Sequence, residues 1–154
     1  MARHKAGTFR IRRTRPAQPA DRAQPRSWFR AASGPVLRDV AVHDLAARLG
    51  EPGGFLWVDL DNASHSHVAL LEKVFHLHPL VIEDAASPNG RAKVEEFPGY
   101  LFTVVRAVRY VSETEDPHDI ETFNLGCVLG HGYLVTIHGS HAPGVEAVWE
   151  SIQR

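Results

Sequence analysis

This sequence of 154 residues contains one cysteine and no long run of apolar residues. With Cys127 alone, neither an internal disulfide nor a CxxC metal knuckle can form, so we expect a buried core to hold the fold, as in reducing compartments. The longest apolar stretch, residues 123–137, is interrupted by three glycines, whereas a membrane-spanning helix needs about 20 consecutive apolar residues. We therefore expect no membrane span, and the prolines and charges after Arg15 argue against a secretion signal.

The net charge of −1 conceals a strong asymmetry along the chain. Residues 1–30 hold nine Lys or Arg and a single acid, Asp21, which gives a charge of +8 against −9 for the rest. Residues 1–34 are therefore predicted to form a disordered, basic, proline-containing arm, and residues 35–154 the folded domain. Such an arm either contacts nucleic acid or anionic lipid, or is a solvated tail or the product of a wrongly chosen start codon.

Helical periodicity, apolar and β-branched runs, and turn residues predict the elements of this domain. Helices are expected over residues 42–49, from the cap Ser64 to His78, from Pro79 to residue 86, and from Val145 to the chain end. Strands are expected over residues 55–60, 93–97, 100–110, 118–129 and 133–138, with a mobile acidic loop at 112–117. This order predicts an α/β fold with a mixed, partly antiparallel sheet and helices packed on its faces.

Two adjacent acids, Glu83 and Asp84, are the main candidates for chemistry. Mg2+ is a hard cation that keeps several waters and is held in proteins by one or two carboxylates, so a solvent-facing pair suits it. Neighbours on a helix point about 100° apart, which lets the two acids address different surfaces. The alternative is a pair of solvated acids without a ligand.

Ten histidines and Cys127 offer other chemistry, which the spacing does not favour. In His65-x-His67 and His76-x-His78 the side chains would point about 200° apart on a helix, whereas a helical zinc pair needs i, i+4 spacing. We interpret His78 as a packing or capping residue. We interpret His131, His138 and His141 as ordinary surface histidines, and Cys127 as a small buried apolar residue and not a nucleophile.

The segments His78–Ala85 (HPLVIEDA), Gly90–Glu95 (GRAKVE) and Tyr100–Phe102 (YLF) resemble the cytoplasmic N-terminal domain of CorA-type magnesium and cobalt transporters. Trp57–Leu60 and Leu134–His138 agree with that family's order, and the similarity extends over about residues 54–153. One departure is Ala92, where the family usually has proline.

The resemblance implies a partial protein and a regulatory role. The family conducts Mg2+ through a homopentameric pore formed by a long helix and two C-terminal spanning helices with a Gly-Met-Asn signature, none of which occurs in this sequence. The domain is therefore expected to be incomplete at its C-terminus and unable to conduct ions alone. Asp84 and Glu83 would bind regulatory Mg2+, or Co2+, weakly between identical protomers, with further ligands on the missing helix.

From the sequence we thus expect a non-enzymatic, divalent-cation-sensing domain, soluble by itself and placed on the cytoplasmic side of the cell membrane in the full-length family, with no nucleic-acid partner. The first alternative is a soluble interaction module that docks on anionic lipid or nucleic acid through its basic arm. A weaker alternative is a hydrolase that uses the histidines.

Overall fold

The computed structural model describes residues 11–13, 25–61, 65–87, 90–110, 119–139 and 142–152. The strands are β1 (Ile11–Arg13), β2 (Arg26–Arg30), β3 (Val36–Arg38), β4 (Phe55–Asp61), β5 (Lys93–Phe97), β6 (Tyr100–Tyr110), β7 (Ile120–Gly130) and β8 (Tyr133–His138). The helices are the short 3-10 turn η1 (Val42–Asp44), α1 (Leu45–Leu49), α2 (His65–Lys73), α3 (Pro79–Ala86) and α4 (Pro143–Ser151).

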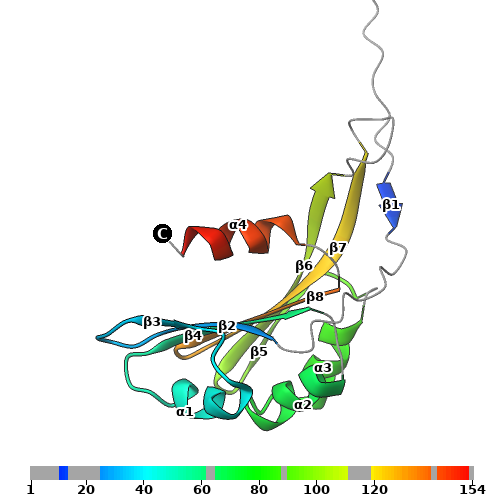
Figure 1. The fold of residues 1–154 in the computed structure, drawn as a ribbon. Coiled ribbons are helices and arrows are strands. Elements are labelled where there is room, and N and C mark those ends of the chain that lie inside the picture. Colours follow the sequence, from blue (N-terminus) through cyan, green and yellow to red (C-terminus); the bar gives the residue numbers. More distant parts are fainter. Residues whose placement is uncertain are drawn as a thin grey trace, which may run out of the picture.

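The strands form one mixed sheet in the order β3-β2-β4-β8-β7-β6-β5 (Figure 1). Strands β4 and β8 are parallel, and the other neighbours in this order are antiparallel. Strand β7 is longer than its partner β8, and β1 pairs in parallel with the part of β7 that β8 does not reach. The predicted α/β class with a mixed, partly antiparallel sheet is confirmed.

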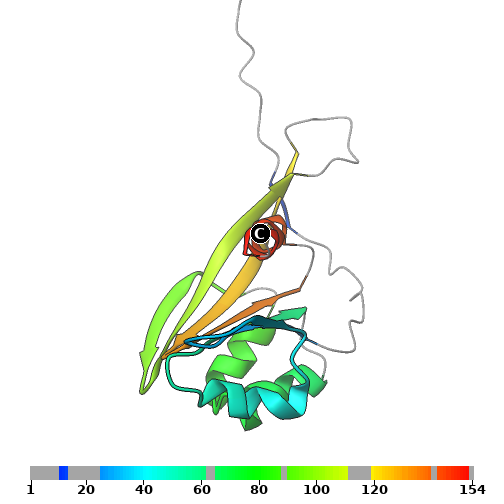
Figure 2. The same ribbon diagram turned by 60° about the vertical axis from the view of Figure 1, so that its left-hand side comes forward.

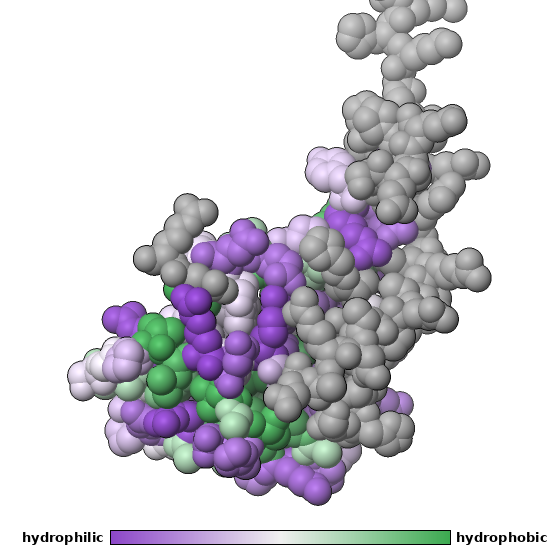
Figure 3. Space-filling model, in the orientation of Figure 1, coloured by the Kyte–Doolittle hydropathy of each residue, from purple (hydrophilic) through white to green (hydrophobic). Residues whose placement is uncertain are grey.

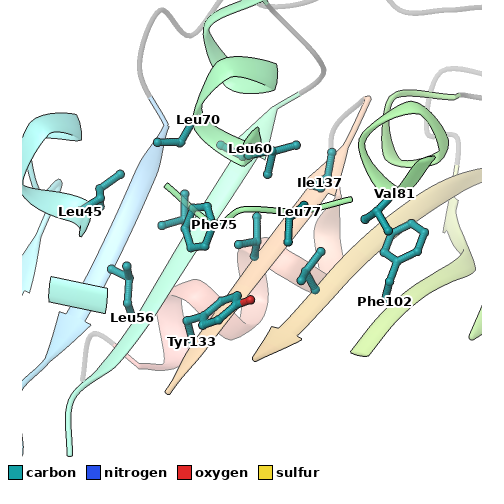
Figure 4. Close-up of a cluster of buried hydrophobic side chains, with 14 of the residues drawn as sticks. Leu45, Leu56, Leu60, Leu70, Phe75, Leu77, Val81, Phe102, Tyr133 and Ile137 are labelled. Carbon is teal, nitrogen blue, oxygen red and sulfur yellow. The ribbon is translucent and has the colours of Figure 1, made fainter. Parts of the chain in front are cut away.

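Helices α1, α2 and α3 cover one face of the sheet, and α4 lies on the other (Figures 1 and 2). The larger core lies under the three helices, where Leu56, Val58 and Leu60 alternate along β4 and are at most 1% exposed. On α3, Val81 meets Phe102 of β6, and both are fully buried (Figure 4). Burying one such side chain stabilises the fold by about 1.5–3 kcal/mol, so this layer holds α3 firmly on the sheet.

The opposite face carries a smaller apolar cluster beneath α4. Trp57 of β4 and Trp149 of α4 meet edge to face, with ring centroids 4.8 Å apart. Farther along this face, strands β5, β6 and β7 carry large apolar side chains that stay exposed, namely Val94, Leu101, Val105 and Leu129. Helix α4 therefore covers only part of an apolar sheet face.

The predicted domain boundary at Pro35 is too late. Strand β2 lies inside the sheet between β3 and β4, and its Phe29 is 1% exposed in the main core. The side chains of β2 alternate, with Ser27 and Phe29 on the core face and Arg26 and Trp28 on the other face, so a short buried strand is hidden within basic sequence. The remaining arm residues, 1–10 and 14–24, lie outside the described residues, and their disorder stays a prediction.

Most other predicted elements are confirmed, with one clear difference. Strands β5, β6 and β8 and helix α3 have the predicted bounds, and β7 begins two residues later than expected. The helix expected to reach His78 ends at Lys73, because His76 adopts φ +50° and reverses the chain. This left-handed geometry costs about 1–2 kcal/mol, and it places both Phe75 and Leu77 in the core. The cap Ser64 and the loop 112–117 lie outside the described residues.

Candidate functional site

Helix α3 begins with a cap that fixes its start. His78 is the N-cap, its Nδ1 accepts a hydrogen bond from the Leu80 backbone N–H (3.3 Å), and Pro79 follows at the first helical position. The His78 ring also packs 5.7 Å from the ring of Phe97, and its backbone N–H donates to the Tyr100 hydroxyl. The predicted capping and packing role of His78 is confirmed, and it sets the helix on which the two acids lie.

Glu83 lies on the side of α3 away from the core, whereas Asp84, three residues after the buried Val81, lies at the margin of the core-facing side. Val81 is fully buried, whereas Glu83 is exposed and the Asp84 side chain is 38% exposed. After α3, the Gly90 carbonyl accepts a hydrogen bond from Asn124 Nδ2 at 2.8 Å. Glu83 therefore projects from this helix toward solvent, while the Asp84 carboxylate is only partly exposed.

Asp84 has a partner that sequence reasoning missed. Lys93, at the start of β5, donates from Nζ to Asp84 Oδ2 (2.5 Å) and to Glu95 Oε2 (2.9 Å). The hydrogen bond to Asp84, and then that to Glu95, raises the pKa of Lys93 above its ordinary value. Because Asp84 lies on α3 and Glu95 on β5, the ammonium group of Lys93 lies between two carboxylates from different elements.

The donor chemistry of this site fits Mg2+ only in part. Asp84 and Glu83 offer the carboxylate oxygens that Mg2+ prefers, and Mg2+ keeps several waters in such sites. Within the described part of the chain, however, no three His, Cys, Asp or Glu side chains come together as a ligand group. A cation at Asp84 would need ligands from water or from another chain.

The structure also locates Cys127 and two of the three histidines that were interpreted as surface residues. Cys127 is half-buried, and burial followed by the charge of Asp59 raises its pKa to about 11, which opposes a nucleophilic role because the thiolate is the nucleophile. The interpretation of His138 as a surface residue is wrong, because its side chain is 5% exposed. His131 is exposed, and His141 lies outside the described residues.

A buried polar network on the α4 face of the sheet was not predicted. Its centre is Asp59 of β4, which is 3% exposed. Thr136 Oγ1 donates to Asp59 Oδ1 at 2.6 Å, and His138 Nε2 lies 3.2 Å from the same oxygen. The Trp57 indole N–H donates to Thr136 Oγ1 at 3.0 Å. The only sequence signal was an acid at an inward position of an apolar strand.

Arg26 links this network to α4. It forms an ion pair with Asp59, its Nη1 donates to Glu146 Oε2 at 2.8 Å, and its guanidinium lies 4.7 Å from the Trp149 ring centroid. Burial by itself would raise the pKa of Asp59, but hydrogen bonds from His138, Thr136 and Arg26 outweigh it and hold that pKa below its ordinary value. The network therefore contains a carboxylate that is buried and charged, and it joins β2, β4 and β8 to α4.

An apolar groove of about 600 Å³ lies beside this network, between α4 and the sheet. Its lining includes Trp28, Phe55, Phe123, Leu134 and Val148. Figure 3 shows hydrophobic surface at the level of the sheet, between the hydrophilic outer side of α4 and the helices of the other layer. The groove is on the opposite face of the sheet from Asp84.

Comparison with known proteins connects this chain to metal transporters. A family model, CorA-like Mg2+ transporter protein, matches residues 52–154. The putative metal ion transporter YfjQ of Bacillus subtilis is 33% identical over 96 residues, which are 62% of this chain and 28% of YfjQ. A putative metal ion transporter of Schizosaccharomyces pombe is 32% identical over 89 residues, 58% of this chain and 11% of that protein. The chain thus spans less than a third of these curated relatives.

Solved structures share the fold at low sequence identity. The soluble domain of CorA from Methanocaldococcus jannaschii has a TM-score of 0.58 at 16% identity, covering 82% of this chain and 46% of that one. The ZntB cytoplasmic domain from Vibrio parahaemolyticus has a TM-score of 0.61 at 11% identity, covering 83% and 48%. A helix with the length and apolar character of a membrane span does not occur among the described residues. The family match covers most of the folded part, and the chain therefore belongs to the family of CorA-like Mg2+ transporter proteins.

Proposed function

We propose that this chain is the cytoplasmic, regulatory part of a CorA-like magnesium or cobalt transporter, and that it senses a divalent cation without catalysing a reaction. Membership in the CorA-like family supports the transport context. The likeness of its fold to the soluble domain of CorA from Methanocaldococcus jannaschii supports a place outside the membrane. The pore itself would belong to other parts of the transporter.

The observation that carries the proposal is the pair of adjacent carboxylates on α3, with Glu83 on its outer side and Asp84 partly exposed beside it. Glu83 is exposed and Asp84 is partly exposed, while the buried side chain of Val81 packs the same helix against the core. A divalent cation at Asp84 would take its remaining ligands from water and from a neighbouring identical protomer. In a ring each acid then meets a different surface on its neighbour, and a homopentamer is the assembly that the family resemblance suggests.

The cation would act by linking protomers. With Mg2+ or Co2+ between Asp84 and the adjacent protomer, the ring would be held in a closed arrangement, and loss of the cation would release it. Such a link between binding and conformation has a coupling free energy of about 1–3 kcal/mol. In the isolated chain the affinity for Mg2+ is expected to be millimolar or weaker, because most coordination is left to water.

The test is a chimeric channel in which this domain is joined to the pore region of a family member. Replacing Asp84 by Asn keeps the size and one acceptor oxygen but removes the charge, so the Mg2+ concentration that closes the channel should rise at least about fivefold. Asp44→Asn is the matched control, because it removes one charge from another exposed acid and should leave closure unchanged. An unaltered closing concentration in Asp84→Asn would exclude Asp84 as the sensor and leave Glu83 as the next candidate.

A further inference from the structure

The ammonium group of Lys93 lies against the carboxylate to which a cation at Asp84 would bind. It donates to Asp84 Oδ2 at 2.5 Å and to Glu95 Oε2 at 2.9 Å, so one positive charge lies between two carboxylates. The ammonium occupies Oδ2 of Asp84, and its positive charge repels a divalent cation that would bind the same carboxylate through either oxygen. Lys93 and a directly bound divalent cation therefore compete for Asp84.

The backbone on each side of this ion pair is anchored, and only the side chain of Lys93 needs to move. The Lys93 carbonyl accepts a hydrogen bond from Thr103 Oγ1 at 3.0 Å, and Lys93 pairs in register with Val104 of β6. Its Nζ lies 5.5 Å from the ring centroid of the buried Phe102. Because the backbones of α3 and β5 are both anchored, opening the pair requires only rotation of the lysine side chain.

Exposure makes the pair reversible. The side chains of Lys93 and Asp84 are 28% and 38% exposed, and ion pairs in such positions change an equilibrium constant by about fivefold at most. A doubly charged ion at millimolar concentration can compete with an interaction of that strength. A deeply buried pair would instead block the site permanently.

We propose that Lys93 is a built-in competitor for the cation at Asp84: its ammonium binds the carboxylate when the divalent ion is absent, and the ion must displace it. Lys93 thereby sets the cation concentration to which Asp84 responds. This inference rests on the proposed sensing role of Asp84. The two possible roles of Lys93 predict opposite effects of its removal on the affinity of Asp84 for the cation. Removing a competitor strengthens cation binding, whereas removing a structural support that orients Asp84 weakens it.

The experiment uses the full 154-residue chain and Mg2+ alone, titrated at constant ionic strength while NMR follows the Asp84 side-chain carboxyl and the Lys93 Nζ. Both signals should change with the same midpoint in the unmodified protein. In Lys93→Met the dissociation constant for Mg2+ should fall about tenfold, because competition ends and a positive charge beside the ion is removed. Lys93→Arg keeps the charge and should show no such gain.

Lys73→Met is the matched control, since it removes one exposed lysine at the end of α2 and should change the affinity less than twofold. Equal or weaker Mg2+ binding by Lys93→Met, or an Asp84 response with an unchanged Lys93 signal, would overturn the inference while leaving Asp84 as a sensor. No response of Asp84 to Mg2+, with Asp84→Asn indistinguishable from the unmodified protein, would overturn both the inference and the proposed function. The Mg2+ titration of the unmodified protein shows by itself whether the ion displaces Lys93, so the inference can be tested even if Lys93→Met does not fold.

Discussion

Replacing Arg26 by Met should show how strongly the buried network holds α4 to the sheet. Asp59 is 3% exposed, and without Arg26 it keeps hydrogen bonds only from Thr136 and His138 among its described partners. Removing one partner of a buried ion pair costs about 3–5 kcal/mol. We take the lower end, about 3 kcal/mol, because two partners remain, and add about 0.5–1 kcal/mol for the lost stacking on Trp149.

A loss of this size is a large part of a typical stability of about 5–15 kcal/mol, and for a chain of this length it lowers the melting temperature by roughly 10 °C. Urea unfolding followed by tryptophan fluorescence is a suitable assay, because Trp28, Trp57 and Trp149 all belong to the cluster beneath α4. Arg30→Met is the control: it alters the same face of the same strand at an exposed position and should cost less than about 0.5 kcal/mol. Equal losses in the two variants would refute the reasoning.

Two further predictions concern titration. The pKa of Asp59 is held below its ordinary value of 3.8 in the folded state, so this carboxylate adds stability above that value and the contribution is lost as the pH falls through the lowered pKa. The difference in unfolding free energy between the unmodified protein and Asp59→Asn should therefore be constant above about pH 5 and shrink below about pH 4, and a difference independent of pH would contradict it. For Cys127, a pKa raised from 9.0 to about 11 means about a hundredfold less thiolate at pH 8. Alkylation by iodoacetamide, measured by mass spectrometry, should be slower than in the urea-unfolded chain by about that factor, and equal rates would contradict the burial.

Local patterns predicted much of the fold because each pattern lies within one element. The aromatic and β-branched residues of β6 and the Pro79 start of α3 predicted the observed bounds of these elements. Strand β2 was missed for a physical reason: only five residues long, it lies in a segment whose net charge, averaged over 30 residues, opposes folding. The strand is stabilised by pairing with β4 and by burial of Phe29, and neither effect can be seen in the charge or composition of the surrounding sequence.

The candidate site was predicted as residues but not as an arrangement. Glu83 and Asp84 were proposed from their chemistry and from a family resemblance, and they lie on the predicted helix α3, while their role as metal ligands stays a prediction. The contact between Asp84 and Lys93 depends on how the loop after α3 returns the chain, which the sequence pattern does not define. The Asp59 network was still harder to predict. Its partners Arg26, Thr136 and His138 lie 33, 77 and 79 residues away in the sequence, and they come together only through the pairing of three strands.

The outermost strand β5 also affects how this protein behaves among many copies of itself. Exposed strand edges invite a strand from another molecule to add by backbone hydrogen bonds, and charged side chains on the edge oppose such addition. Strand β5 carries Lys93, Glu95 and Glu96 within five residues, and the opposite edge strand of the ordered sheet, β3, has only three residues. A second β5 brought alongside in antiparallel or parallel register would have to bring further Glu and Lys side chains against this cluster of ion pairs. The described sheet thus ends in one charged edge and one very short edge, and both disfavour growth into a fibril even though part of its face is apolar and uncovered.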